Sequence, residues 1–117
     1  MTEFTNKIVN GSSLDVLEKI PNKTFDLVFA DPPYNMQIGA NLRRPDASKV
    51  NGVNDKWDQF ESFKHYDDFC KAWLIECKRI LKDNGSIWVI GSYHNIFRLG
   101  YHLQNLDYWL LNDVIWR

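Results

Sequence analysis

The sequence predicts an α/β fold with a doubly wound, parallel sheet, and two observations carry that prediction. Residues 25–30 and 86–90 are short apolar runs, almost free of polar side chains, as expected of strands that are covered on both faces. Stretches with apolar residues three and four apart, the period of a helix packed on a sheet, alternate with these runs. Such alternation produces parallel strands joined by right-handed crossovers. The 117 residues therefore make one domain at most.

Each expected element has a local justification. A capping signal, Ser12 with Asp15 three residues later, precedes the first helix, and Pro21 ends it. The longest amphipathic helix carries positive side chains in its last turns, which suit the helix dipole, and Asn84-Gly85 ends it. The expected elements are, in order, a strand over 7–10, a helix over 14–20, a strand over 25–30, a helix from residue 66, a strand over 86–90, a helix over 95–105 and a strand over 108–116.

The composition is that of an ordinary globular protein, with 44% hydrophobic and 25% charged residues and a net charge of −1. This balance argues against a protein that grips nucleic acid through bulk positive charge, so any DNA contact must be local. Cys70 and Cys77 lie ~10 Å apart along a helix, beyond disulfide reach. We expect no metal, no membrane association and a cytoplasmic location, because zinc-ligand spacing, long apolar runs and a signal-peptide core are all missing.

The most informative stretch is Asp31-Pro32-Pro33-Tyr34, which directly follows the strand over 25–30. Each proline lacks an N–H and forces the residue before it into an extended conformation, so the sheet must end at Ala30. Asp31 then lies just beyond the carboxyl end of a parallel strand, where open α/β sheets bind their ligands. This position predicts a functional site.

These four residues suit the chemistry of an exocyclic amino group. The carboxylate of Asp31 and the carbonyl of Pro32 are two acceptors at one site, and an amino group offers two N–H donors. Holding both donors orients the nitrogen lone pair toward an electrophile. Tyr34 adds a flat face on which a base rotated out of its helix stacks. The alternative is a plain strand-ending turn in which Tyr34 only packs.

Four further segments extend the pattern, namely residues 41–46, 55–60, 87–97 and 111–116. With them, Asp31-Pro32-Pro33-Tyr34 resembles the catalytic motif of N6-adenine DNA methyltransferases, in particular the cell-cycle-regulated members of the β group, which modify the adenine of GANTC. The resemblance runs from about residue 8 to the last residue. It implies that Asp31, Pro32, Pro33 and Tyr34 are catalytic and that S-adenosylmethionine is the methyl donor. It also implies double-stranded DNA as partner and a homodimer as a candidate state of the full-length enzyme.

The chain departs from that family in its cofactor-binding residues. Family members carry a Phe-x-Gly-x-Gly loop in the carboxyl-terminal half, and no Gly-x-Gly occurs here. The turn after the first strand usually carries an Asp, whereas Ser12 and Ser13 stand here. Ser12 and Asp31 are the remaining candidates for cofactor contacts. We therefore expect residues 1–117 to be the amino-terminal portion of a methyltransferase domain, part of a Rossmann-like, doubly wound sheet in circularly permuted order whose central strands are missing.

A long polar loop is expected at about residues 35–61, and loops of that length are usually functional or mobile. Arg43 and Arg44 are candidates to hold DNA phosphates or to read a guanine edge, and Asn35 is a third candidate DNA contact. The alternative is a solvated loop with ordinary surface charges. Trp57 and Phe60 are expected to anchor its far end to the core.

Three functions remain open at this point. The leading hypothesis is a site-specific DNA adenine N6-methyltransferase, truncated here and expected to be inactive alone. The second is a methyltransferase that acts on RNA or on another amino group, and the third is a catalytically dead remnant or nucleic-acid-binding piece. His94 fits a structural role at a helix start better than that of a general base.

Overall fold

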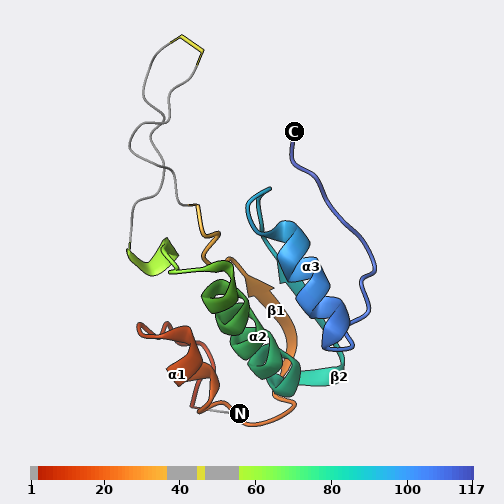
Figure 1. Cartoon of the computed structure of the whole chain (residues 1–117). Coiled ribbons are helices and arrows are strands. Elements are labelled where there is room, and N and C mark those ends of the chain that lie inside the picture. The colour runs from red at the N-terminus through yellow and green to blue at the C-terminus, as the bar shows by residue number, and fades with distance from the viewer. Residues whose placement is uncertain (1–2, 37–44, 47–55) are drawn as a thin grey trace.

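The computed structural model describes residues 3–36, 45–46 and 56–117, and it confirms a small α/β arrangement (Figure 1). The expected positions of Arg43 and Arg44, and most of the long loop, lie outside the described residues. The elements are α1 (Ser13–Leu17), β1 (Phe25–Ala30), a 3₁₀ turn η1 (Lys56–Asp58), α2 (Phe63–Ile80), β2 (Leu81–Val89) and α3 (Ile96–Asn105).

The two strands form a parallel sheet, as the sequence predicts. Phe29 pairs with Trp88 and Ala30 with Val89, so the carboxyl ends of both strands meet at one edge. The chain between them includes the long helix α2, so β1, α2 and β2 make a strand–helix–strand unit, whereas the unit expected from strand 7–10 to strand 25–30 does not form in the described structure. Anything placed directly after β1 therefore lies beside the residues that follow β2.

The hydrophobic core lies between the helices and one face of the sheet (Figure 1). Inward-facing residues of both strands, such as Val28 and Ile87, pack against the helices. The buried cluster itself comes from α2 and α3, at the three- and four-residue spacing seen in the sequence, and consists of Tyr66, Cys70, Trp73, Leu74, Cys77, Leu99 and Leu103.

The opposite face of the sheet is bare within the described part of the chain, which corrects the expectation of strands buried on both faces. Leu27, Phe29 and Trp88 are all at least half exposed there, Phe29 at 66%. The reason is that α2 and α3 both cover the other face. The apolar runs do form strands, as predicted, but the described helices cover only one face of the sheet.

Two of the expected strands do not form. Residues 7–10 and 108–116 have no strand pairing, and Ile8, Trp109 and Trp116 are almost fully exposed. Tyr108 is still fastened, because its hydroxyl donates to the carbonyl oxygen of Leu74 at 2.7 Å, but every residue after it is exposed. A strand needs a neighbour for its backbone groups, and the two described strands pair only with each other.

The long helix α2 ends at Ile80 rather than at Asn84-Gly85. The backbone N–H of Thr24 donates to the carbonyl of Ile80 at 2.7 Å, so the segment before β1 takes up a carbonyl that the helix leaves free. Gly85 lies instead within β2, where the register with β1 shifts. A Cβ there would lie 3.0 Å from the Lys82 carbonyl oxygen, so a larger residue would require neighbouring atoms to move.

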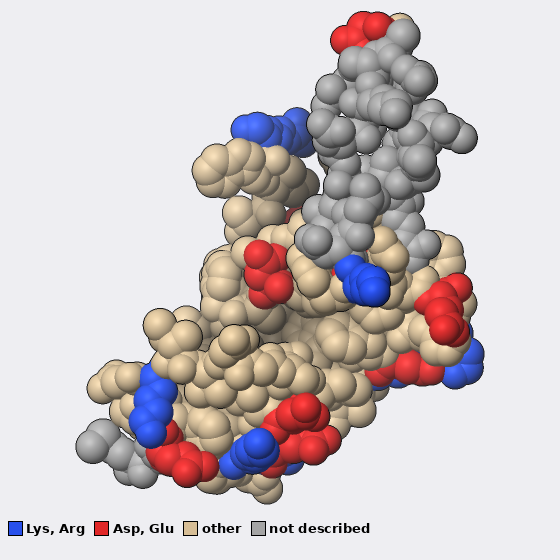
Figure 2. Space-filling view, turned by 90° about the vertical axis from the view of Figure 1, so that its left-hand side faces the viewer, with Lys and Arg blue, Asp and Glu red and all other residues tan. Residues whose placement is uncertain are grey.

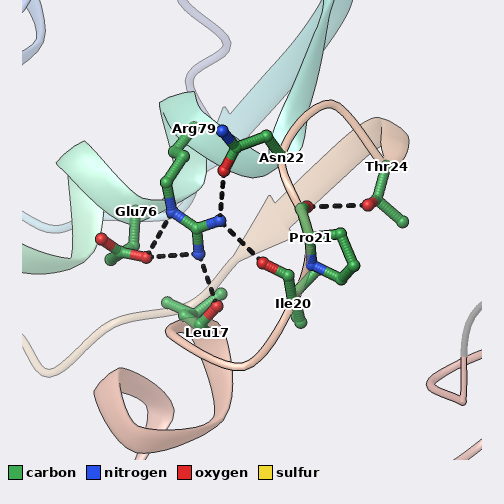
Figure 3. Close-up of polar contacts among 7 residues, drawn as sticks. All are labelled: Leu17, Ile20, Pro21, Asn22, Thr24, Glu76 and Arg79. Atoms are coloured by element: carbon green, nitrogen blue, oxygen red, sulfur yellow. Dashed lines mark hydrogen bonds and ion pairs between the residues drawn. The ribbon is translucent and has the colours of Figure 1, made fainter.

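Arg79 fastens the short helix α1 to α2 (Figure 3). Its guanidinium donates to the carbonyls of Leu17 and Ile20, at 2.8 and 2.7 Å, and to the side chain of Asn22 at 2.7 Å. Glu76 accepts two further bonds from the same guanidinium, at 2.9 and 2.6 Å. The carbonyls of Leu17, the last residue of α1, and of Ile20 just after it are thus both satisfied by the planar guanidinium, which donates to several acceptors at once.

Candidate active site

The Asp31-Pro32-Pro33-Tyr34 motif lies directly at the carboxyl end of β1, as predicted. The last ladder bond runs from the N–H of Ile90 to the carbonyl of Ala30 at 2.9 Å, and the chain leaves the sheet at Asp31. The side chain of Asp31 is exposed. The motif therefore stands at the edge of the sheet, next to the turn that follows β2.

Asp31 and Tyr34 contact each other across the motif. The phenol of Tyr34 donates to Oδ1 of Asp31 at 2.5 Å. Burial raises the pKa of Tyr34 to about 12, and the hydrogen bond to Asp31 and the negative charge of Asp31 add to this effect. At neutral pH the phenol is consequently a neutral donor. No cation among the residues described by the structure pairs with Asp31.

The two proline carbonyls differ in their surroundings. The carbonyl of Pro33 accepts a 2.7 Å hydrogen bond from the buried hydroxyl of Tyr66 on α2. For Pro32, by contrast, no donor from residues 3–36, 45–46 or 56–117 reaches the carbonyl. Within the described residues, the acceptor pair that the sequence predicts, Asp31 and Pro32, is therefore engaged by Tyr34 at Oδ1 of Asp31 and by no donor at the Pro32 carbonyl.

Tyr66 also links the motif to the end of β2. Its hydroxyl accepts from Nδ2 of Asn95 at 3.0 Å, and Oδ1 of Asn95 accepts the backbone N–H of Ser92 at 2.8 Å. Tyr66 and Asn95 are both buried. A continuous chain of hydrogen bonds thus joins Pro33 to the start of α3. The sequence predicts only a core position for Tyr66 and a helix start for Asn95.

Asp58 is the site residue that sequence reasoning missed. Its side chain is only 2% exposed, and its carboxylate accepts the backbone N–H groups of three consecutive residues. The distances are 2.5 Å from Tyr34, 2.9 Å from Asn35 and 2.7 Å from Met36. Asn35 has a positive φ of 58°, which is part of the turn that directs these amides to one side. The only sequence signal was its place within the segment expected to anchor the loop.

That anchoring expectation is half right. Phe60 packs against the core, with its ring centroid 4.9 Å from that of Tyr66 and 5.4 Å from that of Phe69. Trp57 is 62% exposed and does not pack against the described core. The buried carboxylate of Asp58, rather than Trp57, anchors this end of the loop. Three backbone donors compensate the cost of burying the carboxylate.

The other expected site residues are placed less favourably. Ser12 occupies the position before α1, as the capping signal predicts, but it is exposed and its hydroxyl makes no capping bond. No contact in the described part of the chain joins Ser12 to the motif. His94 is exposed, and its backbone N–H donates to the hydroxyl of Ser92 at 3.3 Å, so its contact is structural.

The charge on the described surface is mixed rather than clustered. Figure 2 shows Lys and Arg interspersed with Asp and Glu on the face that it displays, without a broad basic patch. Two of the interspersed pairs on the surface are Lys23 with Asp83 and Lys82 with Asp26. Among the residues that the structure describes, no three His, Cys, Asp or Glu side chains gather as they would around a metal ion, and no described helix is long and apolar enough to cross a membrane.

Comparison with known families identifies the class to which this fold and motif belong. A family model described as DNA methylase matches residues 25–117, so the chain belongs to the DNA methylase family. The match begins at β1 and includes the whole Asp31-to-Tyr34 motif, Asp58 and Tyr66.

Two curated relatives are similar to nearly all of the chain. The Type II methyltransferase M.HinfI of Haemophilus influenzae is 55% identical over 116 residues, which are 99% of this chain and 32% of the relative. The Type II methyltransferase M2.LlaDCHI of Lactococcus lactis subsp. cremoris is 36% identical over 110 residues, 94% of this chain and 40% of the relative. The chain thus spans only about a third of the length of these relatives.

Proposed function

We propose that this chain is the amino-terminal portion of a DNA adenine N6-methyltransferase that transfers a methyl group from S-adenosylmethionine to adenine in duplex DNA, with GANTC as the recognition sequence. Membership of the DNA methylase family and the similarity to two Type II methyltransferases support the class of reaction. The single observation that carries the proposal is the exposed Asp31 carboxylate at the carboxyl end of β1, followed directly by a Pro32 carbonyl to which no described residue donates. GANTC rests on the resemblance of the segments described above.

The motif acts on the amino group of the target base. Asp31 accepts one N–H of the amine and the Pro32 carbonyl accepts the other, which aims the nitrogen lone pair at the methyl donor. Tyr34 gives up its bond to Asp31 as the amine arrives, and its ring then stacks against the extruded base. Formation of the N–C bond requires the methyl–sulfur bond of the donor to break, so the positive charge passes from sulfur to nitrogen, where the carboxylate of Asp31 stabilises it. The nitrogen then loses one proton to solvent.

The described residues of this chain do not by themselves build a site for the cofactor. Ser12 is exposed and makes no contact with the motif in the described part of the structure. S-adenosylmethionine supplies an electrophilic methyl group when it is bound. We propose that it binds to residues in the part of the enzyme that corresponds to the other two thirds of M.HinfI. Asp31 contributes to the amine side of the reaction.

The sheet is proposed to be part of a larger, circularly permuted doubly wound sheet. The exposed apolar face formed by Leu27, Phe29 and Trp88 supports this, because such a face is normally covered in an α/β protein. The unpaired segments at 7–10 and 108–116 support it as well. A dimer of the full-length enzyme stays a prediction.

A catalytically inactive remnant is the second candidate, and the position of Ser12 favours it for the chain alone. Calorimetric titration of the 117 residues with S-adenosylmethionine tests an expectation that both candidates share, namely undetectable binding by this chain alone. Micromolar binding would contradict the remnant and would also place cofactor contacts within this chain.

The decisive experiment restores those two thirds. This chain replaces the matching 116 residues of M.HinfI, and the chimera is assayed for methyl transfer to the adenine of duplexes that contain GANTC or a permuted sequence. We expect transfer to the GANTC duplex alone, and its loss in Asp31→Ala. A folded chimera that methylates neither duplex would overturn the proposal, and activity that survives Asp31→Ala would remove Asp31 from the mechanism.

A further inference from the structure

Three consecutive backbone amides immediately after the catalytic motif converge on one buried carboxylate, that of Asp58. The donors are Tyr34, Asn35 and Met36, at 2.5 to 2.9 Å. Asp58 forms no ion pair with a described residue, so these amides are what stabilises its charge within the described structure. Hydrogen bonds to an ionised acceptor are about twice as strong as neutral ones, so this contact fixes the loop firmly.

We infer that Asp58 is a positioning residue for the Asp31-to-Tyr34 motif, an inference that rests on the proposed function. The motif is only four residues long, and it is held at both ends. The sheet ladder fixes Ala30 on one side, and Asp58 fixes the amide of Tyr34 on the other. The direction in which the Asp31 carboxylate and the Pro32 carbonyl point therefore depends on Asp58, although Asp58 itself contacts neither.

The sequence distance between these partners gives the contact a further consequence. Asp58 lies 22 to 24 residues after the amides that it binds, in the short turn η1. Residues 36 and 56 therefore bound a chain segment whose two ends are held together by this carboxylate. Asp58 therefore orients the motif, and it also joins residue 36 to η1, which are the described ends of the intervening segment.

Asp67 offers a matched control within the same chain. Like Asp58 it accepts several hydrogen bonds, from Arg98 at 2.8 Å and from His102 at 3.1 Å, but it lies on α2 and bonds to α3 rather than to the motif. Asp58→Asn and Asp67→Asn make the same chemical change. Both substitutions are expected to weaken packing, and only Asp58→Asn is expected to disturb catalysis.

The kinetic test uses the chimera with M.HinfI, at a temperature at which all variants are folded. We expect Asp58→Asn to lower kcat by about 10- to 100-fold, because small displacements of reacting groups cost about that much, while KM for DNA changes less than about threefold. Asp58→Glu, which keeps the charge, should recover part of kcat. Asp67→Asn should leave kcat within about twofold of the parent. Equal kcat values for Asp58→Asn and Asp67→Asn would overturn the inference.

A second measurement on the unmodified 117-residue chain does not need activity. Hydrogen exchange of the amides of Tyr34, Asn35 and Met36 should accelerate at least tenfold in Asp58→Asn and stay unchanged in Asp67→Asn, since each tenfold corresponds to about one hydrogen bond of this kind. Unchanged protection in Asp58→Asn would refute the positioning contact. An inactive parent chimera combined with lost protection would count against the proposed function while leaving the contact of Asp58 established.

Discussion

Replacing Tyr66 by Phe removes one hydroxyl from the centre of the described structure and leaves the ring in place. That hydroxyl is fully buried, donates to the Pro33 carbonyl at 2.7 Å and accepts from Asn95 at 3.0 Å. Both partners then lose a hydrogen bond, and a buried group left unsatisfied costs about 1–3 kcal/mol. Pro33 is only half-buried and regains water in part. We therefore expect Tyr66→Phe to lower the free energy of unfolding by about 2 kcal/mol.

Urea unfolding followed by circular dichroism measures this change, and Tyr101→Phe is the control. Tyr101 lies on α3 and is 61% exposed, so the same chemical change there should alter the free energy of unfolding by less than about 0.5 kcal/mol. A double-mutant cycle with Asn95→Ala should reveal a coupling of about 1 kcal/mol between the two side chains. The reasoning is refuted if Tyr66→Phe destabilises the chain no more than Tyr101→Phe does.

Three further predictions concern Tyr34, Arg79 and the two cysteines. The pKa of Tyr34, followed by ultraviolet titration, should lie near 12 and fall only in part in Asp31→Asn, because burial, the larger cause of the raised pKa, remains. The stability that the neutral phenol contributes is fully present below about pH 10 and is lost as pH rises through 12, and an unchanged pKa in Asp31→Asn would contradict the contact. Arg79→Lys keeps the charge but loses the planar guanidinium that donates to several acceptors, so urea unfolding should show that the free energy of unfolding falls by about 2 kcal/mol. An unchanged urea midpoint would show that other contacts hold α1. Burial raises the pKa of both Cys70 and Cys77 to about 11, so an aromatic disulfide reagent at pH 8 should react with these thiols only after urea has unfolded the chain. Rapid reaction of the folded chain would contradict the burial of the two thiols.

The sheet and the motif could be predicted because local chemistry determines them. A run such as residues 25–30 has few alternatives to a strand, and two prolines directly after it force the chain out of the ladder. The helix that carries Tyr66 and Trp73 follows from the spacing of its apolar residues. In each case the pattern lies within about 20 consecutive residues, and no distant partner is needed to interpret it.

The features that the sequence did not predict correctly depend on partners far away in the chain. Residues 7–10 and 108–116 have strand-like composition, but a strand also needs a neighbour, and sequence pattern does not reveal whether one is present. Asp58 was missed for the same reason, since its role appears only when residues 34–36 are brought to it from more than 20 positions away. Likewise the end of α2 was misplaced because Thr24, far upstream, takes up the carbonyl of Ile80.

The contacts that hold the motif have a consequence for the proposed enzyme. The motif is fixed by β1, by Asp58 in η1 and by Tyr66 on α2, and Asn95 links Tyr66 to the residues after β2. All of these partners lie within the present chain, and none belongs to the bare face of the sheet. The geometry that we propose to bind the amine is thus assembled within the described part of this chain, and in our proposal the remaining two thirds of the relatives supply the cofactor site. Inactivity of the isolated chain would then reflect a missing methyl donor site rather than a disordered motif, and adding the rest of the enzyme as a separate polypeptide should restore transfer.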